Sequence, residues 1–198
     1  MRRITGEKFV KLINKNPSWC KNLKEKIEIT TYAGLDSSNI THLSPLITFS
    51  GRDQDGWAAS FINVKTLKIA TGTFLGFVNF AGTGIEEIKN LIVRETQKKG
   101  SAANFFNCRN LKVATGNFEG FVNFNNSGVE TIKDLNIKNL EGDREKARFN
   151  NCPIQYIPKQ YRGKAFLFEK EVIKKSIKKD KIEETIKQMK SETNNIEI

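Results

Sequence analysis

Residues 67–91 read LKIATGTFLGFVNFAGTGIEEIKNL, and residues 111–135 read LKVATGNFEGFVNFNNSGVETIKDL. Sixteen of the 25 aligned positions are identical, and the two stretches lie 44 residues apart. The same offset relates Phe61 to Phe105 and Phe149, and it relates Cys108 to Cys152. Self-similarity with a period of about 20 to 50 residues is the signature of repeat architectures. The sequence therefore predicts a stack of similar units.

Each 44-residue period contains two shorter units. An apolar anchor is followed by a small residue three positions on and by aliphatic residues five and eight positions on, as in Phe80, Thr83, Ile85 and Ile88. Two of the units fit this spacing with a slip of one residue. Long and short units alternate, because the anchors lie 26, 19, 25, 19 and 25 residues apart. The six anchors are Leu35, Phe61, Phe80, Phe105, Phe124 and Phe149.

The repeat spacing resembles that of a known family. Residues 75–88 follow the pattern L-x-x-V-x-F-x-x-T-x-I-x-x-I, which is similar to the leucine-rich repeat. The stretches FFNCRNL at 105–111 and FNNCPI at 149–154 resemble the F-x-N-C-x-x-L motif of the irregular bacterial, BspA-like type. The resemblance covers residues 30–157, and it departs from the family in its variable unit length and in Phe where Leu is usual. A different right-handed parallel β-solenoid is the alternative fold.

The resemblance implies an α/β repeat solenoid with one parallel sheet of about six short strands. We expect these strands near residues 33–36, 59–62, 78–81, 103–106, 122–125 and 147–150, with the four anchors from Phe80 to Phe149 stacked in one buried column. The small residue after each anchor is expected to hydrogen-bond the backbone where the chain turns, and the later aliphatics to fold back over the core. We interpret Ala70-Thr71-Gly72 and its copy Ala114-Thr115-Gly116 as tight turns between units.

The ends of the array are expected to be helical. We divide the chain into an N-terminal helical cap (1–28), a leucine-rich-repeat-like solenoid (29–158) and a C-terminal helical cap and tail (159–198). Apolar spacing predicts a first helix over 5–16, with Thr5 as its N-cap, and a second short helix from Ser18. After Pro158 the pattern predicts a cap helix over 161–177 and a further helix over 179–198.

Side chains between the buried strand positions should point outward, and the resemblance places them on the concave face of the sheet. This face combines asparagines with aromatic residues, which suits recognition because amides both donate and accept hydrogen bonds. A neighbouring column, which includes Asn107, Asn126 and Asn151, is assigned to the same face. The alternative is structural, with stacked asparagines bonding one another and a cap covering the aromatics. The predicted partner-binding residues are Trp57, Phe77, Asn79, Asn104, Phe106, Phe121, Asn123 and Arg148.

Catalytic and metal-binding patterns are missing from the sequence. Three cysteines without C-x-x-C spacing argue against a zinc site or a disulfide framework, and the single His42 leaves little room for a catalytic triad. The carboxylates Glu86, Glu87 and Glu130 lie near lysines and indicate a solvated face. We therefore expect no catalytic residues, no metal and no cofactor, and a protein that is not an enzyme.

Charge adds a second hypothesis about partners. The formal net charge is +11, and the first 28 residues carry eight Lys or Arg against three acids, while residues 159–198 carry eleven against seven. We predict a protein-binding scaffold, similar in architecture to bacterial effector or surface repeat proteins. The alternative is a binder of nucleic acid or anionic membrane through the basic ends, Arg2–Lys26 and Lys159–Lys190. No apolar run is long enough to span a membrane and no secretory signal is recognised, so we expect a cytoplasmic protein, with signal-independent export as the alternative.

Overall fold

The structure is a computed structural model that describes residues 1–94, 100–138, 145–163 and 166–194. It is an α/β protein with two parallel sheets of seven strands each and two helices. Sheet 1 contains, in spatial order, β1 (Arg2–Ile4), β2 (Ile27–Ile29), β4 (Ile47–Phe49), β6 (Ile69–Phe74), β8 (Glu87–Arg94), β10 (Val113–Glu119) and β12 (Thr131–Lys138). Sheet 2 contains β3 (Ala33–Gly34), β5 (Trp57–Ser60), β7 (Phe77–Asn79), β9 (Ser101–Asn104), β11 (Phe121–Asn123), β13 (Ala147–Arg148) and β14 (Phe166–Leu167).

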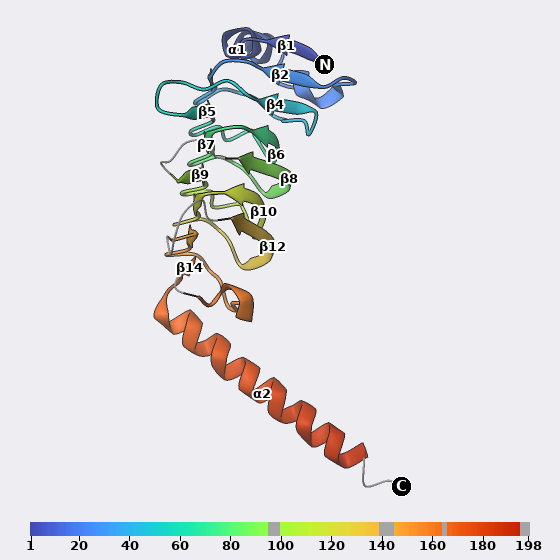
Figure 1. The fold of residues 1–198 in the computed structure, drawn as a ribbon, viewed down its shortest axis with the longest axis vertical. Coiled ribbons are helices and arrows are strands. Elements are labelled where there is room, and N and C mark those ends of the chain that lie inside the picture. Colours follow the sequence, from blue (N-terminus) through green and yellow to red (C-terminus); the bar gives the residue numbers. More distant parts are fainter. Residues whose placement is uncertain (95–99, 139–144, 164–165, 195–198) are drawn as a thin grey trace.

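From β2 to β13 the chain alternates between the two sheets, and each strand from β2 to β11 pairs in parallel with the second strand after it. Figure 1 shows the strands stacked along the long axis, with α1 (Gly6–Lys15) at the N-terminal end and α2 (Lys170–Asn194) extending from the other end. Short 3-10 helices lie at Trp19–Asn22 and Lys159–Tyr161. Neither sheet closes into a barrel within the described residues.

The prediction of one sheet with about six strands was wrong. The six predicted positions correspond to β3, β5, β7, β9, β11 and β13 of sheet 2, which gains β14 as a seventh strand, and sheet 1 was missed entirely. Strand β8 explains the miss, because Ile88, Leu91 and Val93 are buried at spacings of three and two. An extra residue at Asn90, with φ of 51°, makes a β-bulge that interrupts the alternation expected of a strand. Ile88 was therefore predicted to lie in a segment that folds back over the core, whereas it belongs to β8.

The two predicted turns are also strands. Ala70-Thr71-Gly72 lies inside β6, and its copy Ala114-Thr115-Gly116 lies inside β10. Pairing shifts by one residue within both triplets, opposite the bulges of β8 and β12. Gly72 and Gly116 have φ of 105° and 121°, which a residue with a Cβ rarely adopts. The glycines thus let β6 and β10 continue past the bulges of their partner strands and do not reverse the chain.

The predicted phenylalanine column is confirmed and is longer than expected. Neighbouring rings lie 4.9 to 5.3 Å apart, with their planes within 15° of parallel. The column contains Phe61, Phe80, Phe105, Phe124, Phe149 and Phe168, the last of which comes from the C-terminal region. Sheet 1 supplies rings to the other side of the core, where Phe74 and Phe118 meet the column edge to face. Aromatic rings from both sheets therefore meet in the core, beside buried aliphatic residues.

Several units turn away from sheet 2 through a small polar residue that bonds the backbone, as predicted, but the unit of Phe61 has the apolar Val64 at this position, and Ser38 Oγ has no partner among the described residues. Thr83 Oγ1 donates to the carbonyl of Phe80 at 2.8 Å, and Cys108 Sγ lies 3.1 Å from that same oxygen. Cys152 Sγ lies 3.0 Å from the carbonyl of Phe124. One residue earlier the backbone is left-handed in every unit, with φ of 54° to 66°. These residues are Ser37, Asn63, Gly82, Asn107, Asn126 and Asn151, so the column assigned to the strand face forms the turns.

The N-terminal region combines a helix with a strand. Helix α1 is capped by Thr5, whose Oγ1 accepts a hydrogen bond from the amide of Lys8 at 3.2 Å, as predicted. Strand β1 precedes it and pairs with β2, so the first residues extend sheet 1. This pairing was not predicted, because three residues are too few to show alternation.

The C-terminal region differs from the two helices predicted. Strand β14 precedes α2, and α2 is one continuous helix from Lys170 to Asn194. Its first part is tied to the body, because Arg162 Nη1 pairs with Asp180 Oδ2 at 2.5 Å and Tyr156 donates to Asp180 Oδ1 at 2.8 Å. Residues 181–189 are exposed, and in Figure 1 the helix projects away from the sheets. Neither described helix is long and apolar enough to cross a membrane.

We predict that Phe124→Ala lowers the free energy of unfolding by about 3–5 kcal/mol, because it leaves a cavity between two stacked rings. The control Asn123→Ala points outward and should cost about 1 kcal/mol, the value of one hydrogen bond to the amide of Asn125. Urea unfolding of the two variants measures the difference. A loss near zero for Phe124→Ala would contradict the observed register.

We predict that docking of α2 weakens in acid. The hydrogen bonds from Arg162 and Tyr156 lower the pKa of Asp180, so its ionised form stabilises the folded state. This stabilisation is present above the ordinary pKa of aspartate, near 4, and is lost as the pH falls through the lowered pKa. Hydrogen exchange at the amide of Ile157, which donates to Ser176 Oγ of α2, reports docking.

The wild-type chain should therefore lose protection of Ile157 as the solution is acidified. Asp180→Asn should show weak protection at every pH, and Glu183→Gln on the exposed part of α2 should behave like the wild type. Equal pH profiles for the wild type and Asp180→Asn would refute the role of this carboxylate.

Candidate binding face

Strand pairing places one side chain from each of the strands β5, β7, β9, β11 and β13 of sheet 2 in a single row. Pairing aligns Ser60 with Asn79, Asn79 with Asn104, Asn104 with Asn123, and Asn123 with Arg148. We call these five residues the polar row. Adjacent strands lie about 4.8 Å apart, so the row is roughly 20 Å long. The structure thus brings four of the predicted site residues side by side: Asn79, Asn104, Asn123 and Arg148.

The predicted aromatic residues flank this row in two places. Trp57 and Phe77 pair across β5 and β7, with ring centroids 4.9 Å apart and planes at 64°. The guanidinium of Arg148 lies over the ring of Phe121 at 5.5 Å, and Glu145 holds it through hydrogen bonds of 2.5 and 2.8 Å. All three rings are half-buried, which leaves part of each for contact. Phe106 stands apart in the turn after β9 and is 40% exposed.

The asparagines of the row use their side-chain oxygens internally. Oδ1 of Asn79, Asn104 and Asn123 accepts from the backbone amide two residues later, at 3.0, 3.1 and 3.0 Å. A backbone amide can only donate, so the acceptor atom of each side chain is the oxygen. Asn104 Nδ2 also donates to Asn79 Oδ1 at 3.2 Å, which links two strands. The amides are therefore structural through their oxygens, and their NH2 groups provide the polar surface.

Exposure along the row increases toward the C-terminal end. Ser60 and Asn79 are buried, Asn104 and Asn123 are half-buried, and Arg148 is exposed. Ser60 is also occupied, because its hydroxyl donates to Asp36. The part of the row that can touch a partner therefore runs from Asn104 to Arg148.

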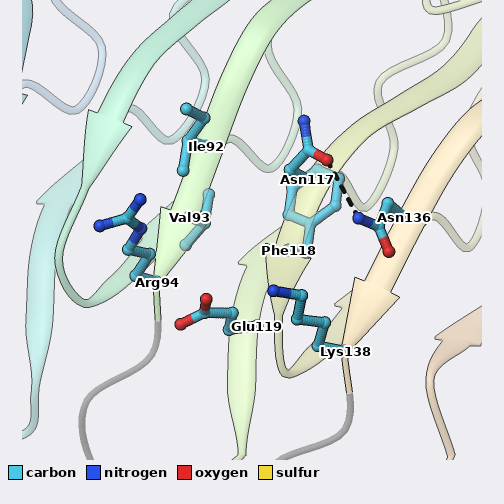
Figure 2. A pocket seen from close by; sticks show the side chains of 8 residues that line it. All are labelled: Ile92, Val93, Arg94, Asn117, Phe118, Glu119, Asn136 and Lys138. Carbon is cyan, nitrogen blue, oxygen red and sulfur yellow. Dashed lines mark hydrogen bonds between the residues drawn. The ribbon is translucent and has the colours of Figure 1, made fainter.

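A separate hollow lies on sheet 1, at the ends of β8, β10 and β12 (Figure 2). Figure 2 shows Arg94, Glu119 and Lys138 in adjacent positions, as the strand register requires. Asn136 Nδ2 donates to Asn117 Oδ1 at 3.2 Å beside them. The lining holds one carboxylate, no histidine and no cysteine, so it lacks the paired groups of acid–base catalysis. Sequence reasoning missed this hollow because it missed sheet 1.

In the described part of the chain, the side chains that could act in catalysis or metal binding have other roles. No three His, Cys, Asp or Glu side chains there are grouped to hold a metal ion. His42 Nδ1 lies 2.8 Å from Thr41 Oγ1, so a neighbouring hydroxyl satisfies it. Glu86 pairs with Lys68 at 2.7 Å and Glu130 with Lys112 at 2.6 Å, as expected of a solvated face. Burial raises the pKa of the Cys20 thiol to about 12 and also raises that of Cys108, which disfavours the nucleophilic thiolate.

A second hollow, at the turns next to the polar row, was also missed. Its lining includes Phe106, which was predicted, and Arg109, which was not. The sequence did contain a signal, because Asn63, Asn107 and Asn151 recur at the 44-residue offset. The turn conformation brings Asn107 and Asn126 into this hollow, whereas the sequence analysis placed them on the strand face.

Comparison with known proteins finds no matching family model, no matching curated protein and no matching solved structure.

We predict that the thiols of Cys20, Cys108 and Cys152 react slowly in the folded protein. All three are buried, and burial raises their pKa values, so little thiolate is exposed at neutral pH. Labelling with a chromogenic disulfide reagent should give no fast phase in buffer and three equivalents in urea. A fast equivalent in buffer would identify a reactive cysteine and contradict the packing described above.

Proposed function

We propose that the chain is a non-catalytic scaffold that binds another protein through the outward face of sheet 2. The fold that we propose for it is a solenoid of the leucine-rich-repeat type. The regular exchange between two parallel sheets and the recurring left-handed turn support a stack of similar units. Strand β1 with α1 at one end, and β14 with α2 at the other, would serve as its caps.

The observation that carries this proposal is the continuous row from Asn104 to Arg148 with aromatic rings beside it. Small-molecule sites are enclosed and mostly apolar, whereas this surface is open and extends across several strands. Aromatic and arginine side chains contribute most to the binding energy of protein interfaces. Phe121 under Arg148, and Trp57 against Phe77, are held in place by their neighbours, so little side-chain entropy would be lost on binding.

Binding at this face should occur without turnover. The predicted contact residues are amides, aromatic rings and one guanidinium, and none of them takes up a proton at neutral pH. Arg148 is held by Glu145, which raises its pKa further.

The basic ends provide the alternative, a nucleic acid or anionic membrane as partner. Helix α2 favours it in one respect, because lysines such as Lys178, Lys181 and Lys187 are exposed on a helix that projects into solvent. Acidic residues Glu183 and Glu184 are interspersed among them, which weakens the local positive potential.

We predict that the double variant Phe121→Lys with Asn123→Asp binds the protein partner at least about tenfold more weakly, because it places charges on a desolvated contact. A protein captured by the wild-type chain from a lysate serves as ligand, and calorimetry measures its affinity. The control Val113→Lys with Asn117→Asp makes the same charge changes on the outward face of sheet 1 and should keep affinity within about twofold.

Unchanged affinity of the first variant, with the fold intact by circular dichroism, would move the site to the basic ends. Affinity should then fall steeply with added salt, which is the signature of an anionic partner.

A further inference from the structure

The C-terminal end of the polar row opens into the hollow formed by the turns that follow β9, β11 and β13. Adjacent turns are joined by backbone hydrogen bonds. The amide of Asn107 donates to the carbonyl of Asn125 at 3.0 Å, and the amide of Asn126 donates to the carbonyl of Asn150 at 2.9 Å. The hollow has a volume of about 570 Å³, and Phe106, 40% exposed, forms one wall. It is shallow and open, so a bound segment could enter and leave along its length.

The asparagines in and beside this hollow present free hydrogen-bond donors. Asn107 Oδ1 accepts from Arg109 Nε at 2.9 Å, and Asn126 Oδ1 accepts from Asn151 Nδ2 at 2.8 Å. Asn125 Oδ1 accepts from the backbone amide of Asn150 at 2.9 Å. Within residues 1–94, 100–138, 145–163 and 166–194, no acceptor is found for the NH2 groups of Asn107, Asn125 and Asn126. Each of these three oxygens already accepts one bond, whereas the NH2 groups remain available as donors to a ligand.

Arg109 adds an uncompensated positive charge. It is exposed, it is the sole charged residue in the lining, and it forms no ion pair with any described residue. Its equivalent one period earlier, Lys65, donates to the carbonyl of Gly82 and is thereby occupied. Arg109 Nε bonds Asn107 Oδ1, but no acceptor among the described residues is found for its two Nη groups, whereas the ammonium of Lys65 contacts a backbone carbonyl.

The chain itself seats one carboxylate beside this hollow. Glu169 Oε1 accepts from the backbone amide of Asn151 at 3.1 Å. The same turn geometry recurs at Asn107 and Asn126, where no carboxylate of the described chain lies in the lining. The equivalent backbone amides of Asn107 and Asn126 already donate to the carbonyls of Asn125 and Asn150, so an acidic group from outside would meet the side-chain NH2 groups of Asn107 and Asn126 and the guanidinium of Arg109.

We propose that this hollow and the adjoining row receive an extended acidic peptide segment of the partner, an inference that rests on the proposed protein-binding function. A carboxylate pairs with Arg109, and the peptide carbonyls accept from the side-chain NH2 groups of Asn107 and Asn126. Phe106 packs against an apolar side chain of the segment. An extended peptide offers one carbonyl acceptor at every residue, which suits neutral amide donors in neighbouring turns.

The charge distribution favours a peptide over a nucleic acid at this site. Nucleic-acid binding gains most of its affinity from several cations that neutralise phosphates. Near this hollow Arg109 is unpaired, whereas Arg148 is compensated by Glu145 and Lys112 by Glu130. One free cation among amides matches a carboxylate with neighbouring carbonyls.

The test is a nuclear magnetic resonance titration of the full chain with a peptide of roughly eight residues that alternates valine and glutamate, which favours an extended conformation. The side-chain amide signals of Asn107 and Asn126 and the Nε signal of Arg109 should shift together. Arg109→Gln should weaken binding about tenfold, the value of one charge-assisted hydrogen bond. Lys65→Gln removes the same net charge and should change affinity by less than about twofold.

Three outcomes would overturn the proposal. They are equal losses for Arg109→Gln and Lys65→Gln, shifts confined to the lysines of α2, and tighter Arg109-dependent binding of oligouridine than of the peptide. If Lys65→Gln fails to fold, the test is decided by which residues of the wild-type chain show shifted signals when the peptide is added. A captured partner that depends on Phe121 and Asn123, with no shift at Asn107 or Asn126, would refute this inference and leave the proposed function standing.

Discussion

Stacked phenylalanine rings and parallel strand pairing have almost the same spacing in this protein, and the rest of the structure depends on that match. The rings of the column lie 4.9 to 5.3 Å apart, and neighbouring strands of any sheet lie about 4.8 Å apart. Each unit can therefore add one strand and one ring without strain. A slip of one residue would expose a whole row of rings, so the column also sets the register of sheet 2.

The register of the core determines the outward surface. When Val122 and Phe124 point inward, Asn123 must point outward between them, and pairing then aligns it with Asn104 and Arg148. The asparagines have two roles at once. Their oxygens close the turns after the strands, which stabilises the stack, and their N–H groups form the exposed polar surface. A structural role and a binding role for these amides are compatible.

Sheet 1 and the C-terminal helix complete the molecule in different ways. Sheet 1 closes the core by packing Phe74 and Phe118 against the column. Its longer strands pass the shorter strands of sheet 2, and the bulges take up the extra residues. Helix α2 is attached through the polar contacts of Asp180, while its second half is exposed. Packing thus holds the stack together, and the first part of α2 is fastened by hydrogen bonds of Asp180 and Ser176 and by apolar contacts of Val172 and Ile173.

The sequence by itself determined the features that repeat. The repeating features are the 44-residue offset, the phenylalanine anchors and the small corner residues, and they could be read from the sequence because each depends on local spacing. The Thr5 cap could be read in the same way. The row of Asn79, Asn104, Asn123 and Arg148 followed from alternation alone. Only the tertiary structure decided the second sheet, the strands β1 and β14, and the turn hollow with Arg109. The bulges at Asn90 and Asp134 hide the strand period, and a left-handed turn moves Asn107 and Asn126 off the strand face. Both effects arise from contacts between units that are distant in sequence.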